Sequence, residues 1–171
     1  MKSVFEYIMM FIASVFVQVL LFNNIEFSWW VHIVVFPMFV YLLPMEMSTL
    51  KVMLLSLLLG LCVDFLSAVP GIYTATMLVV GITRRLLLLL FAGRQMIQDG
   101  GVPLCEKIGV PNFLKYVTTA MLCFFFIFFT LDKLSFDNYW VIVIQSFSST
   151  LVSVPLIYVF QLLFATRRIG I

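Results

Sequence analysis

Charged residues are scarce in this chain. Lys and Arg account for 10 of its 171 residues and Asp and Glu for 8, so 11% is charged, against about 25% in an ordinary soluble domain. Apolar residues make up 64%, and the mean hydropathy is +1.18. A soluble globule of this size has too few buried positions for so much apolar side chain. The composition excludes a soluble enzyme, a nucleic-acid binder and a disordered tail, and it predicts an integral membrane protein.

Residue types that bind metals or carry catalysis are also few. The chain has one histidine, His32, and three cysteines. Because Cys62, Cys105 and Cys123 lie far apart and form no CxxC pair, they indicate neither a disulfide framework nor a zinc site. No Ser/His/Asp set, glycine-rich phosphate loop or paired-carboxylate motif is visible. We therefore predict a protein without enzymatic activity, cofactor or metal.

Long apolar runs take up most of the chain. Each is close to the ~20 residues that a helix needs to cross the hydrocarbon core, and turn-forming residues separate them. Runs of this length exclude an outer-membrane barrel, whose alternating strands are about 10 residues long. The runs cover residues 5–22, 27–43, 50–66, 72–91, 113–131 and 139–164. The predicted fold class is all-α, with a single transmembrane domain over residues 1–171 and about six spans.

The positive charges are unevenly distributed between the two sides that these spans define. With both termini in the cytoplasm, Lys133 lies on the outer side and every other Lys and Arg lies on the inner side. Cytoplasmic connections of membrane proteins are enriched in Lys and Arg. The sequence therefore predicts an even number of spans and two cytoplasmic termini. The inner residues are Lys2, Lys51, Arg84, Arg85, Arg94, Lys107, Lys115, Arg167 and Arg168.

The fourth run contains two adjacent arginines, Arg84 and Arg85. An Arg at a helix centre costs ~2.5–3.5 kcal/mol on insertion scales, and each Leu returns only ~0.5 kcal/mol. We expect the helix to shift until both guanidinium groups reach the cytoplasmic headgroups, which makes both arginines candidates for a cytoplasmic interface. The connection that follows, residues 92–112, is predicted either to lie along the membrane surface or to contact a partner.

Asp64 is the most informative single residue, because a carboxylate within an apolar run is costly. Ser56, Gly60 and Asp64 recur every four residues, so they share one helix face of small and polar side chains suited to helix packing. Three interpretations of Asp64 stay open. It caps the turn that contains Pro70 and Gly71, it forms hydrogen bonds inside the protein, or it takes part in transport or catalysis.

A second polar stripe lies on the last run, where Gln145, Ser149 and Ser153 are also four residues apart. The first run carries Gln18 at the same spacing from a serine. Such side chains usually form hydrogen bonds between helices, each worth ~0.6 kcal/mol, and the alternative is that they line a solute cavity. Pro37 is expected to kink the helix of the second run.

The order of these features resembles that of the rod shape-determining protein MreD family. The resemblance is carried by the stretch LLLGLCVDFLSAVPGIYTATMLVVGITRR at residues 57–85. Family members tend to show a Leu-rich helix with Gly, an Asp four residues later, and then a turn with Pro or Gly. A QDG-type loop follows here, and Gln-Leu-Leu-Phe stands at 161–164. One departure is Ala68, where many relatives have glycine.

The resemblance implies a non-catalytic subunit of the cell-elongation machinery in the bacterial inner membrane, so none of the residues above is expected to be catalytic. Its implied partners are membrane lipid, the bitopic protein MreC, the actin-like protein MreB, and the glycan polymerase and penicillin-binding transpeptidase that build the lateral wall. The alternative is the six-helix substrate-binding subunit of a vitamin-type transporter. That function requires a pocket with convergent polar groups.

Overall fold

The computed structural model describes residues 2–22, 32–69, 71–133 and 139–169, with side chains for 7–20, 32–69, 71–133 and 139–162. Helices account for most of these residues, and none of the described residues is in a strand. The predicted all-α class is therefore confirmed for the described part of the chain.

The helices follow the predicted runs closely, with one exception. Four of them are long and apolar enough to cross a membrane, namely α3, α4, α7 and the Tyr139–Leu162 part of α8, so the chain has the features of a membrane protein. The first helix is apolar over the shorter range Tyr7–Leu20. In chain order the elements are α1 (Lys2–Val17), continued by the π-helix η1 (Gln18–Phe22), α2 (Met38–Tyr41), α3 (Thr49–Ser67), α4 (Ile72–Phe91), α5 (Gly93–Gln98), α6 (Cys105–Ile108), α7 (Val110–Lys133) and α8 (Tyr139–Ile169).

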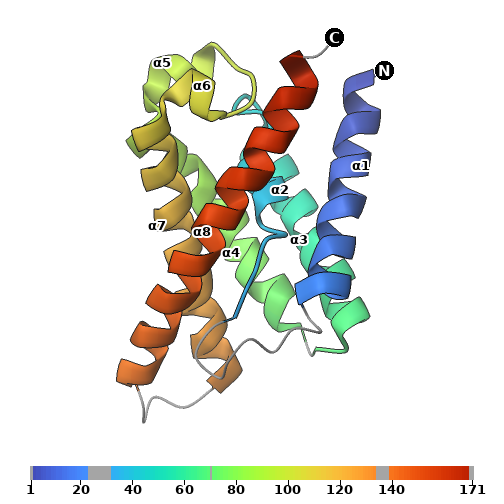
Figure 1. Cartoon of the computed structure of the whole chain (residues 1–171), viewed down its shortest axis with the longest axis vertical. Coiled ribbons are helices and arrows are strands. Elements are labelled where there is room, and N and C mark those ends of the chain that lie inside the picture. Colours follow the sequence, from blue (N-terminus) through green and yellow to red (C-terminus); the bar gives the residue numbers. More distant parts are fainter. Residues whose placement is uncertain (1, 23–31, 70, 134–138, 170–171) are drawn as a thin grey trace.

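The long helices form an upright bundle (Figure 1). The start of α1, the end of α8 and the short helices α5 and α6 lie together at its upper end. We call this the basic end, because the helix ends and connections there carry most of the Lys and Arg residues. The turn between α3 and α4 and the end of α7, which carries Lys133, lie at the opposite end.

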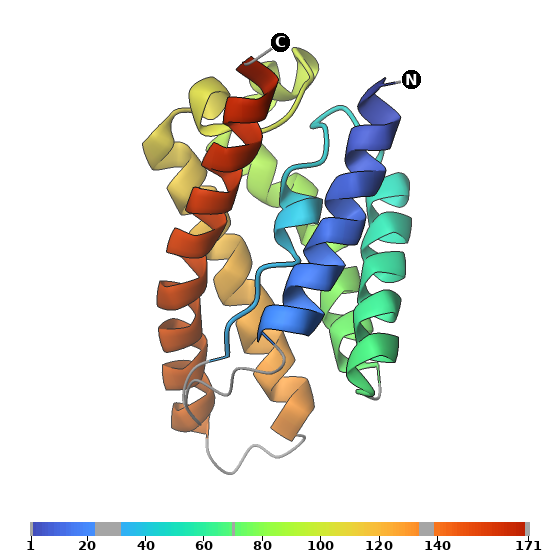
Figure 2. The ribbon, with the colours of Figure 1, turned by 45° about the vertical axis from the view of Figure 1, so that its right-hand side comes forward.

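The exception is the second run, where a helix over residues 27–43 is wrong for most of the described part. Residues 32–37 are not helical, and α2 provides only one helical turn. Residues 27–31 lie outside the described residues. The segment 32–43 rises along the inside of the bundle toward the basic end, between α1 and α8 (Figure 2). An extended chain rises about 3.3 Å per residue and a helix 1.5 Å, so this short segment covers a distance for which a helix would need roughly twice as many residues.

The local sequence explains why the helix does not form. Ile33, Val34 and Val35 are β-branched, which lowers helix propensity and favours an extended backbone. Pro37 then restricts Phe36 to the extended region and removes the N–H that a helix would bond to Ile33. The single turn α2 begins only after this proline. We expected Pro37 to kink a helix, whereas the helix is absent on its N-terminal side.

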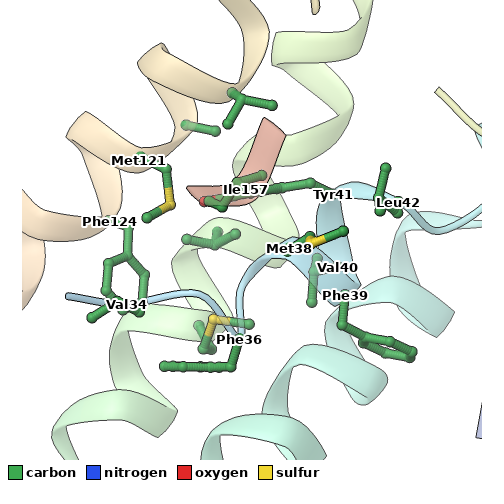
Figure 3. Packing of buried hydrophobic residues seen from close by; sticks show 14 of the residues in the cluster. Val34, Phe36, Met38, Phe39, Val40, Tyr41, Leu42, Met121, Phe124 and Ile157 are labelled. Carbon is green, nitrogen blue, oxygen red and sulfur yellow. The ribbon is translucent and has the colours of Figure 1, made fainter. Parts of the chain in front are cut away.

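This segment forms the centre of the hydrophobic core. Its side chains from Val34 to Phe36 and from Met38 to Leu43 are at most 4% exposed. Phe36 packs edge-on against Phe124 of α7, with ring centroids 5.8 Å apart, and Phe39 packs in the same way against Phe11 of α1 at 5.3 Å. Figure 3 shows Met121 and Phe124 of α7 and Ile157 of α8 near the segment. The segment is therefore buried within the bundle, with α1 and α7 among the helices that cover it.

Candidate functional site: a buried non-helical segment and the side chains that hold it

Gln18 provides hydrogen bonds that the non-helical backbone cannot make with itself. The Val35 N–H donates to Gln18 Oε1 at 2.9 Å, and Gln18 Nε2 donates to the Ile33 carbonyl at 3.2 Å. The Gln18 side chain is fully buried. In hydrocarbon an unpaired backbone group costs several kcal/mol, so non-helical backbone at membrane depth needs such partners. Gln18 also begins the π-helix η1, and π turns are frequent at functional sites.

Two serines of the polar stripe of α8 also accept hydrogen bonds from this segment. The His32 N–H donates to Ser149 Oγ at 3.0 Å, and the Val34 N–H donates to Ser153 Oγ at 3.3 Å. Both serines are fully buried. We expected bonds between helices or a solute cavity, and the partner of these two hydroxyls is instead a non-helical backbone. The four-residue spacing predicts that these side chains share one helix face, but it does not predict what that face contacts.

The third member of that stripe, Gln145, has a different partner. Its side chain is 3% exposed, and its Oε1 accepts a hydrogen bond from Lys133 Nζ at 2.6 Å. Lys133 is the last residue of α7, so this bond ties the end of α7 to α8 at the end opposite the basic end.

His32 links the segment to α4 and α7. Its Nε2 lies 2.9 Å from the Tyr73 hydroxyl, and its ring stacks on Phe128 with centroids 5.3 Å apart. Tyr73 is 2% exposed and stacks on the same phenylalanine at 5.0 Å. We did not single out Tyr73 from the sequence, because an aromatic residue at the start of an apolar run gives no separate signal.

Small residues bring α3 and α4 together. A Cβ placed on Gly60 would lie 2.6 Å from the Thr74 Cα, and one on Gly81 would lie 2.8 Å from Ser56 Oγ. Ser56 is fully buried, and its hydroxyl donates to the Val52 carbonyl one turn earlier. The helix backbones therefore approach so closely at Gly60 that no other residue fits without a shift.

Asp64 caps the amino terminus of α4. Its Oδ1 accepts the Tyr73 N–H at 3.1 Å, and its Oδ2 accepts the Thr74 N–H at 2.7 Å and the Thr74 hydroxyl. These N–H groups belong to the first turn of α4, whose own carbonyl partners are missing, and the helix dipole favours a negative charge there. Asp64 is 5% exposed. Of the three interpretations, the geometry matches hydrogen bonding inside the protein, at the helix that follows the turn.

The turn between α3 and α4 contains two left-handed residues. Ala68 ends α3 with φ 53°, and Gly71 precedes α4 with φ 76°. This conformation is costly for residues other than glycine, so Ala68 ends the helix in a strained backbone conformation. Pro70, the other candidate in this turn, lies outside the described residues.

Arg84 is buried inside the bundle and does not extend outward to the surface, so the expectation that both arginines are exposed is wrong for Arg84. Its side chain is 3% exposed, and its Nη2 donates to the carbonyls of Leu43 and, at 3.4 Å, Pro44. Those carbonyls follow the single turn α2, where few backbone donors are available. Arg85 is exposed at the basic end, and its Nη1 lies 3.4 Å from Thr49 Oγ1. Adjacent residues on a helix point in different directions, so only one of the two arginines faces out.

The connection over residues 92–112 folds against the bundle. The Met45 N–H donates to the Gly101 carbonyl at 2.8 Å, and the Cys105 thiol donates to Gln161 Oε1 of α8 at 3.0 Å. Burial raises the pKa of the Cys105 thiol. These bonds fix α5 and α6 to the basic end, so the connection is a structured cap.

The polar groups described above hold backbone in place and do not converge on a reactive centre. Among the described residues, no group of three or more His, Cys, Asp and Glu side chains could hold a metal ion. Comparisons of the chain with protein-family models, with curated proteins and with solved structures find no match. The functional argument therefore rests on the residues themselves.

Proposed function

We propose that this chain is a non-catalytic membrane subunit of a bacterial cell-elongation complex, of the MreD type. The observation that carries the proposal is the α3–α4 hairpin. The residues of the MreD-like stretch are those that build it, because Gly60 allows the close approach of the helices and Asp64 caps α4. In this proposal the subunit lies in the inner membrane and gathers MreC, MreB, the glycan polymerase and the transpeptidase.

We further propose six crossings with both termini in the cytoplasm, and the segment 32–43 belongs to the second of them. The uneven distribution of Lys and Arg supports this orientation. The start of α1, the end of α8 and the cap formed by α5 and α6 lie at the same end, as an even number of crossings requires. Reporter fusions at Met1, Gly101 and Ile171 should read cytoplasmic, and a fusion at Leu134 periplasmic. A periplasmic carboxy terminus would overturn the topology.

Partners are expected on the outer faces of the helices. The small and polar stripes of α3 and α8 face inward and are engaged in internal bonds, so they are not the docking faces. The outer face of α3 carries an exposed apolar row with the spacing of four and three residues on which a partner helix packs. The row consists of Leu50, Leu54, Leu58, Leu61 and Phe65. Phe65 is 88% exposed and is the best position for a photo-crosslinking residue.

Depletion of the protein in its native host tests the proposal. We expect lateral wall synthesis to disperse, elongated cells to become round, and MreC to co-purify with the tagged protein before depletion. Unchanged cell width together with no MreC association would refute the proposal. Bulk membrane transport should continue, which separates a shape defect from general membrane damage.

One observation favours the transporter alternative. Non-helical backbone buried within a bundle is typical of transporter binding sites, where it contacts the solute. Here, however, the N–H groups of His32, Val34 and Val35 are bonded to Ser149, Ser153 and Gln18. A solute would have to displace these bonds. Loss of uptake of a single nutrient on depletion, with cell shape unchanged, would decide for the transporter.

A further inference from the structure

A small cavity lies near the basic end, between α3, α4 and the connection that precedes α3. Its volume is about 10 Å³, which is room for one water-sized group, and it is partly open to the outside. Arg84, Arg85 and Thr49 supply its polar lining, and Met45, Leu88 and Ile97 are among its apolar walls.

Arg84 carries a buried positive charge to this cavity. The acceptors that reach its Nη2 are the two backbone carbonyls of Leu43 and Pro44, which are dipoles and carry no net charge. Its Nε is buried and has no hydrogen-bond partner among the described residues. A buried guanidinium is normally paired with an anion, because desolvation of the charge is costly. The cavity is therefore lined by a residue whose buried N–H and positive charge an anion would satisfy.

Among the residues that the structure describes, the neighbours of Arg84 do not supply that anion. The Tyr116 hydroxyl lies beside the guanidinium, but it offers a hydroxyl oxygen and not the full negative charge of an anion. Glu46 is exposed, does not line the cavity, and points toward Gly100 on the connection between α5 and α6.

Arg85 and Thr49 extend the polar lining outward. Arg85 is exposed, and its Nη1 lies 3.4 Å from the Thr49 hydroxyl. Arg84, Arg85 and Thr49 thus line one cavity, and one of the two arginines is buried while the other is exposed. Guanidinium groups bind phosphate oxygens with two parallel hydrogen bonds and are preferred for that purpose over lysine.

We propose that this cavity binds the phosphate of an anionic phospholipid headgroup from the leaflet at the basic end. One phosphate oxygen enters beside Arg84, because the cavity admits a single group of that size. The rest of the headgroup lies at the mouth with Arg85 and Thr49, where the apolar walls meet the acyl chains. Basic pockets between helices on the cytoplasmic side of membrane proteins bind such headgroups. This inference does not depend on the proposed role in cell elongation.

The test measures phospholipid bound to the purified full chain by native mass spectrometry, and thermal stability in detergent as lipid is added. The probes are phosphatidylglycerol, phosphatidylcholine and inorganic phosphate. We expect phosphatidylglycerol to be retained and to stabilise the protein, and phosphatidylcholine and inorganic phosphate to have little effect. In Arg85→Gln the affinity for phosphatidylglycerol should fall roughly tenfold, because one charge-assisted hydrogen bond is lost.

Arg94→Gln is the matched control, since Arg94 is exposed on α5 at the same end and does not line the cavity. It should retain phosphatidylglycerol like the parent protein. Equal losses in both variants would show a general attraction of the basic end and overturn the proposal. Stabilisation by inorganic phosphate as strong as by lipid would assign the site to a free anion and also overturn it. Thr49→Val, which removes one hydroxyl, provides a second variant if Arg85→Gln folds poorly, and it should weaken lipid binding without a change in net charge.

Discussion

The α3–α4 hairpin and the segment 32–43 are both buried parts of one bundle, and they are held by opposite means. In the hairpin each helix satisfies its own backbone, so contact requires only small residues at Gly60 and Gly81 and one cap from Asp64. The start of the segment, residues 32–35, has no such internal ladder, and the N–H groups of His32, Val34 and Val35 depend on Gln18 from η1 and on serines of α8. Regular backbone therefore needs local chemistry, whereas irregular backbone needs partners far away in the chain.

The largest effect is expected at Gly60, where the change tests whether the hairpin depends on the close approach of its two helices. In Gly60→Leu a side chain must enter where a Cβ alone would lie 2.6 Å from the Thr74 Cα, and backbone cannot move aside as a side chain does. We expect a loss of about 3 kcal/mol or more in the free energy of unfolding and poor accumulation in the membrane. Thermal unfolding in detergent and membrane yield are the measurements.

Leu61→Phe is the control for Gly60→Leu, because Leu61 is 51% exposed on the neighbouring position of α3. It adds bulk on a face where no helix of this chain packs, so it should leave the stability of the purified protein nearly unchanged. Normal stability of Gly60→Leu would show that the hairpin does not depend on close approach.

The segment is tested by Gln18→Leu. This change leaves the Val35 N–H and the Ile33 carbonyl without partners, and a buried unpaired group costs about 1–3 kcal/mol. We expect a loss of about 2–3 kcal/mol in the free energy of unfolding. Ser149→Ala and Ser153→Ala each remove one acceptor and should cost about 1 kcal/mol.

Ser146→Ala is the matched control on α8, since its buried hydroxyl donates to the Ile142 carbonyl within the same helix. It should cost less than either of the other serine variants. Equal costs for Ser146→Ala and Ser153→Ala would mean that the bonds to the segment contribute no more than an ordinary bond within a helix.

Asp64→Asn should have a smaller effect than either Gly60→Leu or Gln18→Leu. Both carboxylate oxygens accept N–H groups of α4, and an amide presents only one oxygen, so its NH₂ group must face a donor. Loss of a helix cap and its charge costs about 1 kcal/mol. Thr74→Val removes only the hydroxyl bond to Asp64 and should cost less. Thermal unfolding of the two variants side by side checks the order, and an unchanged stability of Asp64→Asn would contradict the capping role.

The smallest effect is expected for Pro37→Ala. This variant separates the effect of the proline itself from the effect of the distant side chains that bond to the segment. Pro37 has φ −61°, which alanine adopts without strain, and the three side-chain partners of the segment remain. We expect a change of less than about 1 kcal/mol and no gain in helix content by circular dichroism. An increase in helix content would show that the proline alone prevents a helix. Pro155→Ala, inside α8, is the contrasting variant and should stabilise its helix.

Those parts of the fold that depend on local sequence could be predicted from it. Run length and apolarity placed α3, α4, α7 and α8 within a few residues, and the four-residue spacing of Ser56, Gly60 and Asp64 indicated one inward face. These predictions succeed because a helix of apolar residues satisfies its backbone by itself, so its position depends little on the rest of the chain.

The conformation of the second run and the burial of Arg84 depend on tertiary contacts and could not be predicted from the sequence. The run 27–43 is as apolar as a membrane span. Pro37 alone is compatible both with a kinked helix and with the absence of a helix. The outcome depends on whether acceptors such as Gln18 and Ser149 are present in space to replace the missing ladder. Arg84 is a second case, because its partners are the carbonyls of Leu43 and Pro44, about 40 residues earlier in the chain, and the apolarity of the fourth run gives no sign of them. Hydropathy measures the transfer of a side chain out of water and contains no information about such distant polar partners. The long helices therefore follow from the sequence, whereas the conformation of the segment between them follows from the hydrogen bonds that the folded bundle provides.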